Sequence, residues 1–175
     1  MSQLTLEGPI AGLDVLDMTS GLRGMQWETK IHADINLDAS AYRKVTVRGS
    51  FQKLPFKNES FEKILFDPPH VLDQRNTLLG SFPVTSGEGP VIATWKYGCY
   101  RNINQLRKAL YEGTREAHRV LKSGGWMIFK WSDAEKSYDW AVASVDQRFR
   151  IERISRRASG AGTGNGTWLS WYRKP

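Results

Sequence analysis

The sequence is poor in the residues that build covalent and metal cross-links. Its 175 residues include one cysteine, Cys99, and three histidines scattered along the chain. One cysteine cannot form an internal disulfide, and the histidines lack the spacing of zinc ligands. The sequence therefore predicts neither a disulfide framework nor a metal centre, and it fits a reduced, cytoplasmic environment.

Long apolar runs are also missing. No apolar segment approaches the roughly 18 residues that a membrane helix needs, and the N-terminus lacks the basic-then-apolar pattern of an export signal. Acidic residues are fewer than basic ones, at 18 against 25, which gives a net charge of +7. We therefore expect no membrane partner, and the excess of cations favours a polyanionic partner such as nucleic acid.

Length and periodicity indicate one α/β domain over residues 1–175, preceded by an N-terminal arm at residues 1–11. The clearest helix spans 102–122, where apolar residues recur every three or four positions and Asn102 and Gln105 resemble a capping pair. Gly124 and Gly125 are expected to end it. A short helix is expected at 137–145, and strands are expected at 13–16, 31–36, 44–47, 64–66, 149–157 and 167–173. This alternation predicts a mostly parallel sheet with helices on both faces.

The most informative stretch is Ile64-Leu65-Phe66-Asp67-Pro68-Pro69-His70. Its apolar run is typical of a buried parallel strand. The two prolines end the strand and stiffen it, and they push Asp67 towards extended geometry. A carboxylate is therefore held rigidly at the carboxyl end of a strand, which is the end where ligands bind in open α/β sheets. Alone, the motif could also be no more than a stiff strand end.

Asp-Pro-Pro-His resembles the Asp-Pro-Pro-aromatic motif of class I S-adenosylmethionine-dependent methyltransferases, and more narrowly that of amino-methyltransferases acting on nucleobases. The segment 119–131 closely resembles the junction before the fifth strand of that family, and 23–28 resembles a branch of small phage-type enzymes. The resemblance implies a doubly wound, seven-stranded sheet whose last strand is antiparallel. It also implies that Asp67, Pro68, Pro69 and His70 form the catalytic motif.

The cofactor implied by the resemblance is S-adenosylmethionine. Asp17 and the turn after it resemble the first family motif, although Thr19 stands where the family has glycine and the third glycine is displaced to Gly24. An ordinary turn between a strand and a helix is the alternative. Asp34 stands where an acid at the end of the second strand binds the ribose hydroxyls. The expected cofactor-binding residues are Asp17, Thr19, Ser20, Gly21, Arg23, Asp34, Ser50 and Phe51.

Ser50 replaces the acid that contacts the adenine amine in the family, so a hydroxyl or the Phe51 backbone would make that contact. The segment 71–101 has no clear periodicity and is predicted to be an irregular insertion over the substrate pocket. Its end interleaves aromatic residues with cations, which suits bases and phosphates. The expected substrate-binding residues are Trp95, Tyr97, Tyr100 and Arg101. A loop packed on the core is the alternative.

These features favour methyl transfer to an exocyclic amine of a nucleobase, adenine N6 or cytosine N4, with DNA favoured over RNA. The alternatives are base methylation in structured RNA, a non-catalytic methyltransferase-like partner subunit, and a small-molecule methyltransferase. Cations near the C-terminus could serve as a nucleic-acid footing or as ordinary solvated charge: Arg153, Arg156, Arg157, Arg173 and Lys174. The sequence leaves the target base, the target sequence and the oligomeric state open.

Overall fold

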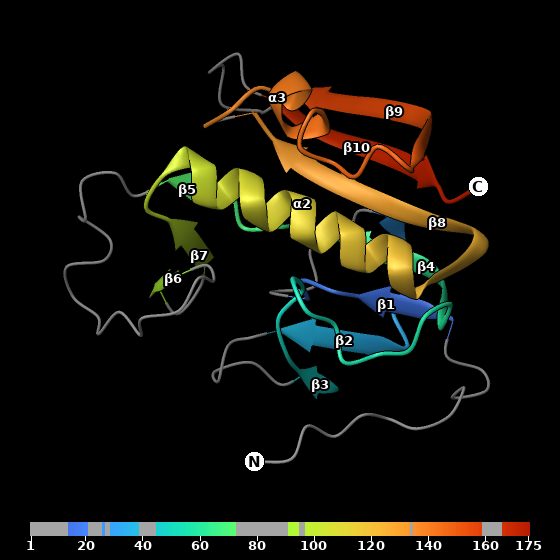
Figure 1. Ribbon diagram of the computed structural model, residues 1–175. Coiled ribbons are helices and arrows are strands. Elements are labelled where there is room, and N and C mark those ends of the chain that lie inside the picture. Colours follow the sequence, from blue (N-terminus) through green and yellow to red (C-terminus); the bar gives the residue numbers. More distant parts are fainter. Residues whose placement is uncertain are drawn as a thin grey trace.

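The computed structural model describes residues 14–20, 26, 29–38, 45–72, 91–94, 97–133, 135–158 and 166–175. Seven strands form one large sheet, and the long helix α2 (Ile103–Val120) crosses one of its faces (Figure 1). The strands are β1 (Val15–Asp17), β2 (Ile35–Asp38), β3 (Val47–Arg48), β4 (Phe61–Phe66), β8 (Leu121–Ser132), β9 (Arg150–Ala158) and β10 (Gly166–Arg173).

The sheet has the strand order β3-β2-β1-β4-β8-β10-β9. The pairs among β3, β2, β1, β4 and β8 are parallel, and β10 runs antiparallel to both β8 and β9. The predicted seven-stranded sheet with an antiparallel last strand is therefore confirmed. The order turns back between β1 and β4, and in open α/β sheets such a switch point forms a ligand crevice at the carboxyl ends of the strands.

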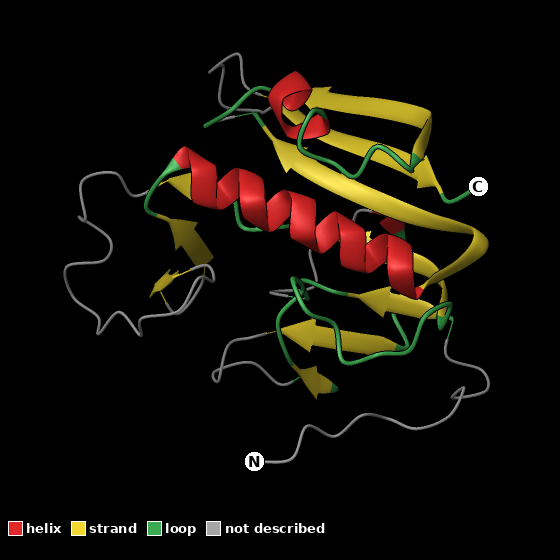
Figure 2. Ribbon diagram, in the orientation of Figure 1, coloured by secondary structure: helices red, strands yellow, loops and turns green. Residues whose placement is uncertain are grey.

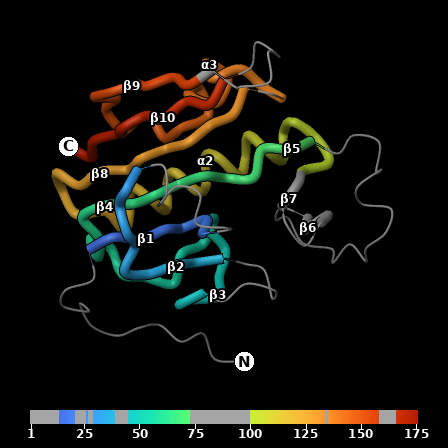
Figure 3. The backbone as a smooth tube through the Cα atoms, turned by 180° about the vertical axis from the view of Figure 1, so that it is seen from behind, coloured from blue at the N-terminus to red at the C-terminus, as the bar shows by residue number. Residues whose placement is uncertain are grey.

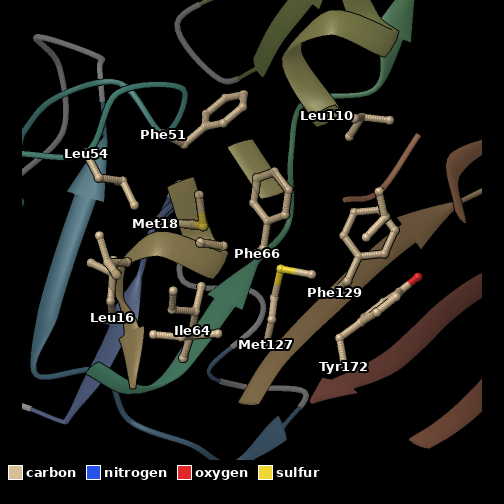
Figure 4. Packing of buried hydrophobic residues seen from close by; sticks show 14 of the residues in the cluster. Leu16, Met18, Phe51, Leu54, Ile64, Phe66, Leu110, Met127, Phe129 and Tyr172 are labelled. Carbon is tan, nitrogen blue, oxygen red and sulfur yellow. The ribbon is translucent and has the colours of Figure 1, made fainter. Parts of the chain in front are cut away.

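The main core lies between α2 and the sheet. Figure 4 shows Leu16, Ile64 and Met127 from three neighbouring strands packed beside the rings of Phe66 and Phe129, and all five side chains are buried. α2 approaches this layer closely at Gly113, where an added Cβ would lie 2.7 Å from the Phe51 ring and 2.9 Å from the Phe66 ring. The short helix α3 (Tyr138–Val142) begins at the N-cap residue Ser137.

The opposite face of the sheet has a smaller core. Val15, Leu65, Ile128 and Leu169 form it, and Ile31, Ala33 and Trp171 pack against it. β4 is therefore apolar on both faces, as its uninterrupted apolar run predicts.

Several predicted boundaries were wrong. The second strand begins at Ile35 and ends at Asp38, so Asp34 precedes it and does not end it. α2 ends at Val120, before the glycines, because the chain enters β8 at Leu121. The capping prediction is confirmed at Asn102, whose side chain accepts a 2.9 Å hydrogen bond from the Gln105 N–H.

A second, three-stranded sheet was not predicted. It consists of β5 (Val71–Leu72), β7 (Tyr97–Tyr100) and β6 (Val91–Thr94), in that order. It lies beyond the carboxyl edge of the large sheet, where α2 begins (Figures 1 and 2). Its β5–β7 pairing is parallel and joins segments far apart in the sequence, which local periodicity cannot indicate. None of the described helices is both long and apolar enough to cross a membrane.

Candidate active site

Asp67 lies directly after β4, at the carboxyl edge of the large sheet. Its backbone N–H donates a 2.7 Å hydrogen bond to the Thr19 hydroxyl, and its Oδ2 accepts one of 3.2 Å from Lys130 Nζ. The Asp67 and Lys130 side chains are 19% and 17% exposed, so the ion pair is largely shielded from water. β8 positions the Lys130 ammonium. Phe129 of β8 pairs with Phe66 of β4, and the residues that follow them, Lys130 and Asp67, form the ion pair. The carboxylate is thus held by its own strand, by the turn after β1 and by β8.

Pro68 and His70 follow Asp67 at the same edge of the sheet. Pro68 is buried, and its carbonyl oxygen lies 3.2 Å from His70 Nδ1. With Nδ1 protonated the imidazole donates to this carbonyl, which keeps a second lone pair. The His70 ring lies 5.4 Å from the ring of Trp131, tilted by 52°. The ring is therefore oriented by two neighbours, one from its own motif and one from β8.

Asp17 ends β1 beside this motif and is 1% exposed. Burial raises its pKa to about 6, because a carboxylate loses its hydration there; the charges of Asp67 and Asp38 add to the rise. Hydrogen bonds from Gln26 Nε2, at 3.0 Å, and from the Thr19 N–H, at 3.3 Å, oppose it. Three carboxylates therefore lie at the ends of three adjacent strands, which suits a cationic ligand.

A network of buried polar side chains is hydrogen-bonded to Asp17. The Gln26 side-chain amide donates both to Asp17 and to Asn36 Oδ1, the latter at 2.6 Å. The Ser20 hydroxyl donates to the same Asn36 oxygen at 3.1 Å. Gln26, Asn36 and Ser20 are each less than a tenth exposed. Because buried polar groups fix one another's geometry when their hydrogen bonds are made, this network holds the turn after β1 in a single arrangement.

Comparison with known proteins identifies the fold. No protein-family model and no curated protein sequence matches this chain. Solved structures do match. A methyltransferase from Methanosarcina mazei aligns over 91% of this chain and 92% of its own, with a TM-score of 0.54 and 13% identity. TrmN from Thermus thermophilus aligns over 94% of this chain and 44% of its own, with a TM-score of 0.59 and 15% identity.

The fold is that of the class I S-adenosylmethionine-dependent methyltransferases. The same fold also carries other chemistry. The [4+2]-cyclase SpnF aligns over 99% of this chain and 78% of its own, with a TM-score of 0.56 and 13% identity. At such identities the methyltransferase fold alone is established, and function has to be argued from the site.

Within the methyltransferase fold, one predicted cofactor residue lies at the wrong end of the sheet. The Asp34 carboxylate accepts hydrogen bonds of 2.8 and 2.9 Å from the N–H groups of Asp14 and Val15, where β1 begins. It therefore caps the amino end of β1. The acid at the carboxyl end of β2 is Asp38.

The remaining predicted cofactor residues divide into three groups. Asp17, Thr19 and Ser20 lie together at the switch point, as described above, whereas Gly21 and Arg23 lie outside the described residues. The Ser50 hydroxyl accepts a 3.2 Å hydrogen bond from the Gln52 N–H. The Phe51 ring is 6% exposed, and its centre lies 5.4 Å from that of the Phe66 ring, so the side chain belongs to the core.

Of the predicted substrate residues, the structure describes the side chains of Tyr100 and Arg101. Tyr100 is 2% exposed and belongs to the main core, so its assignment as a stacking platform was wrong. Arg101 is exposed just before α2, and its backbone N–H donates to the Gln105 side chain at 3.0 Å. Trp95 lies outside the described residues, and the backbone of Tyr97 belongs to β7.

Sequence reasoning missed Lys130, Gln26, Asn36 and Asp38. Lys130 had a detectable signal, because it is the one cation within the segment Trp126–Trp131, whose other residues are apolar, and such a charge usually has a partner. Gln26 and Asn36 gave no comparable signal. No group of His, Cys, Asp and Glu in the described part of the chain could hold a metal ion.

Proposed function

We propose that this protein is an S-adenosylmethionine-dependent methyltransferase that methylates an exocyclic amine of a nucleobase, adenine N6 or cytosine N4, in DNA. The observation that carries the proposal is the rigid carboxylate of Asp67 at the carboxyl edge of a class I methyltransferase sheet, beside a buried Asp17. The proposal rests on the chemistry of these groups.

The residues at the switch point fit the cofactor. S-adenosylmethionine supplies a methyl group made electrophilic by a sulfonium, and it also carries an ammonium group and two ribose hydroxyls. Asp17, with its pKa raised to about 6, would gain from a neighbouring positive charge, which would offset part of its burial cost. Asp38, at the carboxyl end of β2, is the acid suited to the ribose hydroxyls.

Asp67 would orient and polarise the acceptor amine. The lone pair of an aryl amine is spread into the ring, so the nitrogen is a weak nucleophile. Hydrogen bonds from its two N–H groups, to the Asp67 carboxylate and the Pro68 carbonyl, would draw the nitrogen towards tetrahedral geometry. They would also stabilise the positive charge that develops on the nitrogen, an effect called electrostatic preorganisation.

The surroundings suit Asp67 to this task. Lys130 contacts Oδ2 at 3.2 Å and fixes the orientation of the carboxylate. Thr19 fixes the backbone at the same residue. His70 would stack on the base, with Trp131 supporting its ring. Catalysis would therefore depend mostly on positioning.

The deciding experiment is transfer of a tritiated methyl group from S-adenosylmethionine to a panel of acceptors, followed by nucleoside analysis. The panel contains DNA, structured RNA, free nucleosides and small amines. We expect N6-methyladenine or N4-methylcytosine in DNA. Label in RNA alone would replace DNA by RNA as the substrate, and label in small amines alone would refute a nucleic-acid substrate. Absence of cofactor binding by calorimetry would support a non-catalytic subunit.

A further inference from the structure

The C-terminal cations do not form one cluster, because the pleat of the sheet divides them. Side chains alternate between the two faces of a strand, and directly opposed residues share a face. The register places six large side chains on the face turned away from α2: Trp126, Arg150, Arg153, Arg157, Trp171 and Arg173. We call this set the basic face. No position that the described register assigns to this face of β8, β9 and β10 is acidic; the exposed Glu152, next to Arg153, is the extra residue of a bulge in β9 and has no partner in that register.

Two arginines of the basic face lie over tryptophan rings. The Arg153 guanidinium is 4.7 Å from the centre of the Trp171 ring, and that of Arg173 is 4.5 Å from Trp126. A guanidinium stacked in this way keeps N–H donors along its rim, where they can pair with phosphate oxygens. Among the described residues, no salt bridge joins an arginine of this face to a carboxylate.

Arg156 provides a contrast on the same edge strand. It lies on the other face, 5.3 Å from the Trp168 ring, and its guanidinium is 3.9 Å from Asp133. Arg156 is exposed, as are Arg150, Arg153 and Arg157. The charge of Arg156 is therefore paired with Asp133, and Arg156 differs from the arginines of the basic face in the side of the sheet on which it lies.

The basic face is continuous with the candidate active site. Lys130 lies on the same face of β8 as Trp126, and its ammonium contacts Asp67 at 3.2 Å. Figure 3 shows the molecule from this side, and no described helix crosses β9 and β10 there. A strand rises about 3.3 Å per residue, so Arg150 to Arg157 spans about 23 Å.

We propose that the basic face binds the phosphate backbone of the DNA strand that carries the target base, in a segment unpaired at that base. This inference rests on the proposed function, because it takes DNA from there. An exocyclic amine is engaged in base pairing within a duplex, so the base must leave its pair to reach Asp67. Guanidinium groups interleaved with aromatic rings suit an unpaired strand, whose phosphates and bases are both accessible.

The test measures the affinity of two variants for a labelled single-stranded DNA of mixed sequence by fluorescence anisotropy, and it compares the effect per charge removed. The triple variant Arg150→Gln/Arg153→Gln/Arg157→Gln removes three charges from the basic face, and Arg156→Gln removes one from the other face. For single strands each phosphate contact contributes about 0.7 to the slope of log affinity against log salt. The triple variant should therefore lose about 2 from that slope and about 100-fold in affinity at 0.1 M salt. Arg156→Gln should bind as the wild type does.

Several outcomes would overturn the proposal. One is wild-type affinity and slope in the triple variant, with folding verified by circular dichroism. Another is an equal slope loss per charge in Arg156→Gln, which would indicate a diffuse charge effect. Tighter binding of RNA, or of fully paired DNA, would reject the stated ligand. DNA binding with the predicted pattern but without methyl transfer to any acceptor would refute the proposed function and retain the basic face.

Discussion

Replacement of Asp67 by asparagine distinguishes a catalytic role of this residue from a purely structural one. The amide keeps the shape of the side chain and one carbonyl acceptor, but it removes the charge that faces Lys130 at 3.2 Å. If Asp67 stabilises the charge developing on the amine, turnover should fall by about 10²–10³, which corresponds to about 2.7–4 kcal/mol. Affinity for the cofactor should stay near that of the wild type.

The structure also indicates how much folding stability Asp67→Asn should lose. Removing one partner of a fully buried ion pair costs about 3–5 kcal/mol, because the other charge is stranded. Here both side chains are nearly a fifth exposed, and the new amide oxygen can still accept from Lys130. We therefore expect a loss of only about 1–2 kcal/mol, against the 5–15 kcal/mol typical of a small domain. Unfolding would not explain a hundredfold loss of turnover.

The double variant Asp67→Asn/Lys130→Met provides the control. It removes the stranded ammonium, so urea unfolding should show part of the lost stability restored. Steady-state methyl transfer should stay low, because the acceptor carboxylate is still missing. Full turnover in folded Asp67→Asn would remove Asp67 from the catalytic assignment. Recovery of turnover in the double variant would show that Asp67 serves only to neutralise Lys130.

Three further predictions concern the surroundings of Asp67. Asp38→Ala should weaken S-adenosylmethionine binding by roughly 1.5–3 kcal/mol in calorimetry, which is the value of a hydrogen bond to a charged group. Asp34→Ala should chiefly lower the unfolding temperature. The reverse pattern would contradict the assignment of the two acids. Because burial raises the folded-state pKa of Asp17 from 3.8 to about 6, the folded state binds the proton more tightly, and stability should fall by up to about 3 kcal/mol as pH rises from 4 to 6. Urea unfolding across that range should show a flatter profile for Asp17→Asn. Thr19→Val removes the hydroxyl that accepts from the Asp67 N–H and should lower turnover about tenfold, while Thr19→Ser should stay near wild type; equal activity of the two would show that this hydrogen bond is dispensable.

The sequence predicted those parts of the fold whose signals are local. The apolar run of β4, the proline stop after Asp67 and the amphipathic period of α2 each depend on neighbouring residues, and each is present in the structure. The second small sheet was missed because β5 and β7 become neighbours only through long-range pairing. Tyr100 was expected to bind substrate because aromatic residues and cations alternate in its segment, but tertiary packing buries it.

The site was predicted in part for a related reason. Motif order led to Asp17 and Asp67, since each stands at the end of a recognisable strand. Asp34 was chosen as the acid at the end of the second strand because that strand was placed too early in the sequence, and local composition encodes strand boundaries weakly. The partners Lys130 and Gln26 act across strands and loops, and a linear pattern does not record such contacts.

The position of β10 has a consequence for how the chain reaches this structure. β10 lies between β8 and β9, although it follows both in the sequence. During synthesis from the N-terminus, β9 therefore emerges without a neighbour to pair with, and β8 exposes an unpaired edge until residues 166–173 are available. Open strand edges of this kind promote association between chains. The final strand thus acts as a closing element, whose arrival completes the sheet and protects the newly made chain from aggregation.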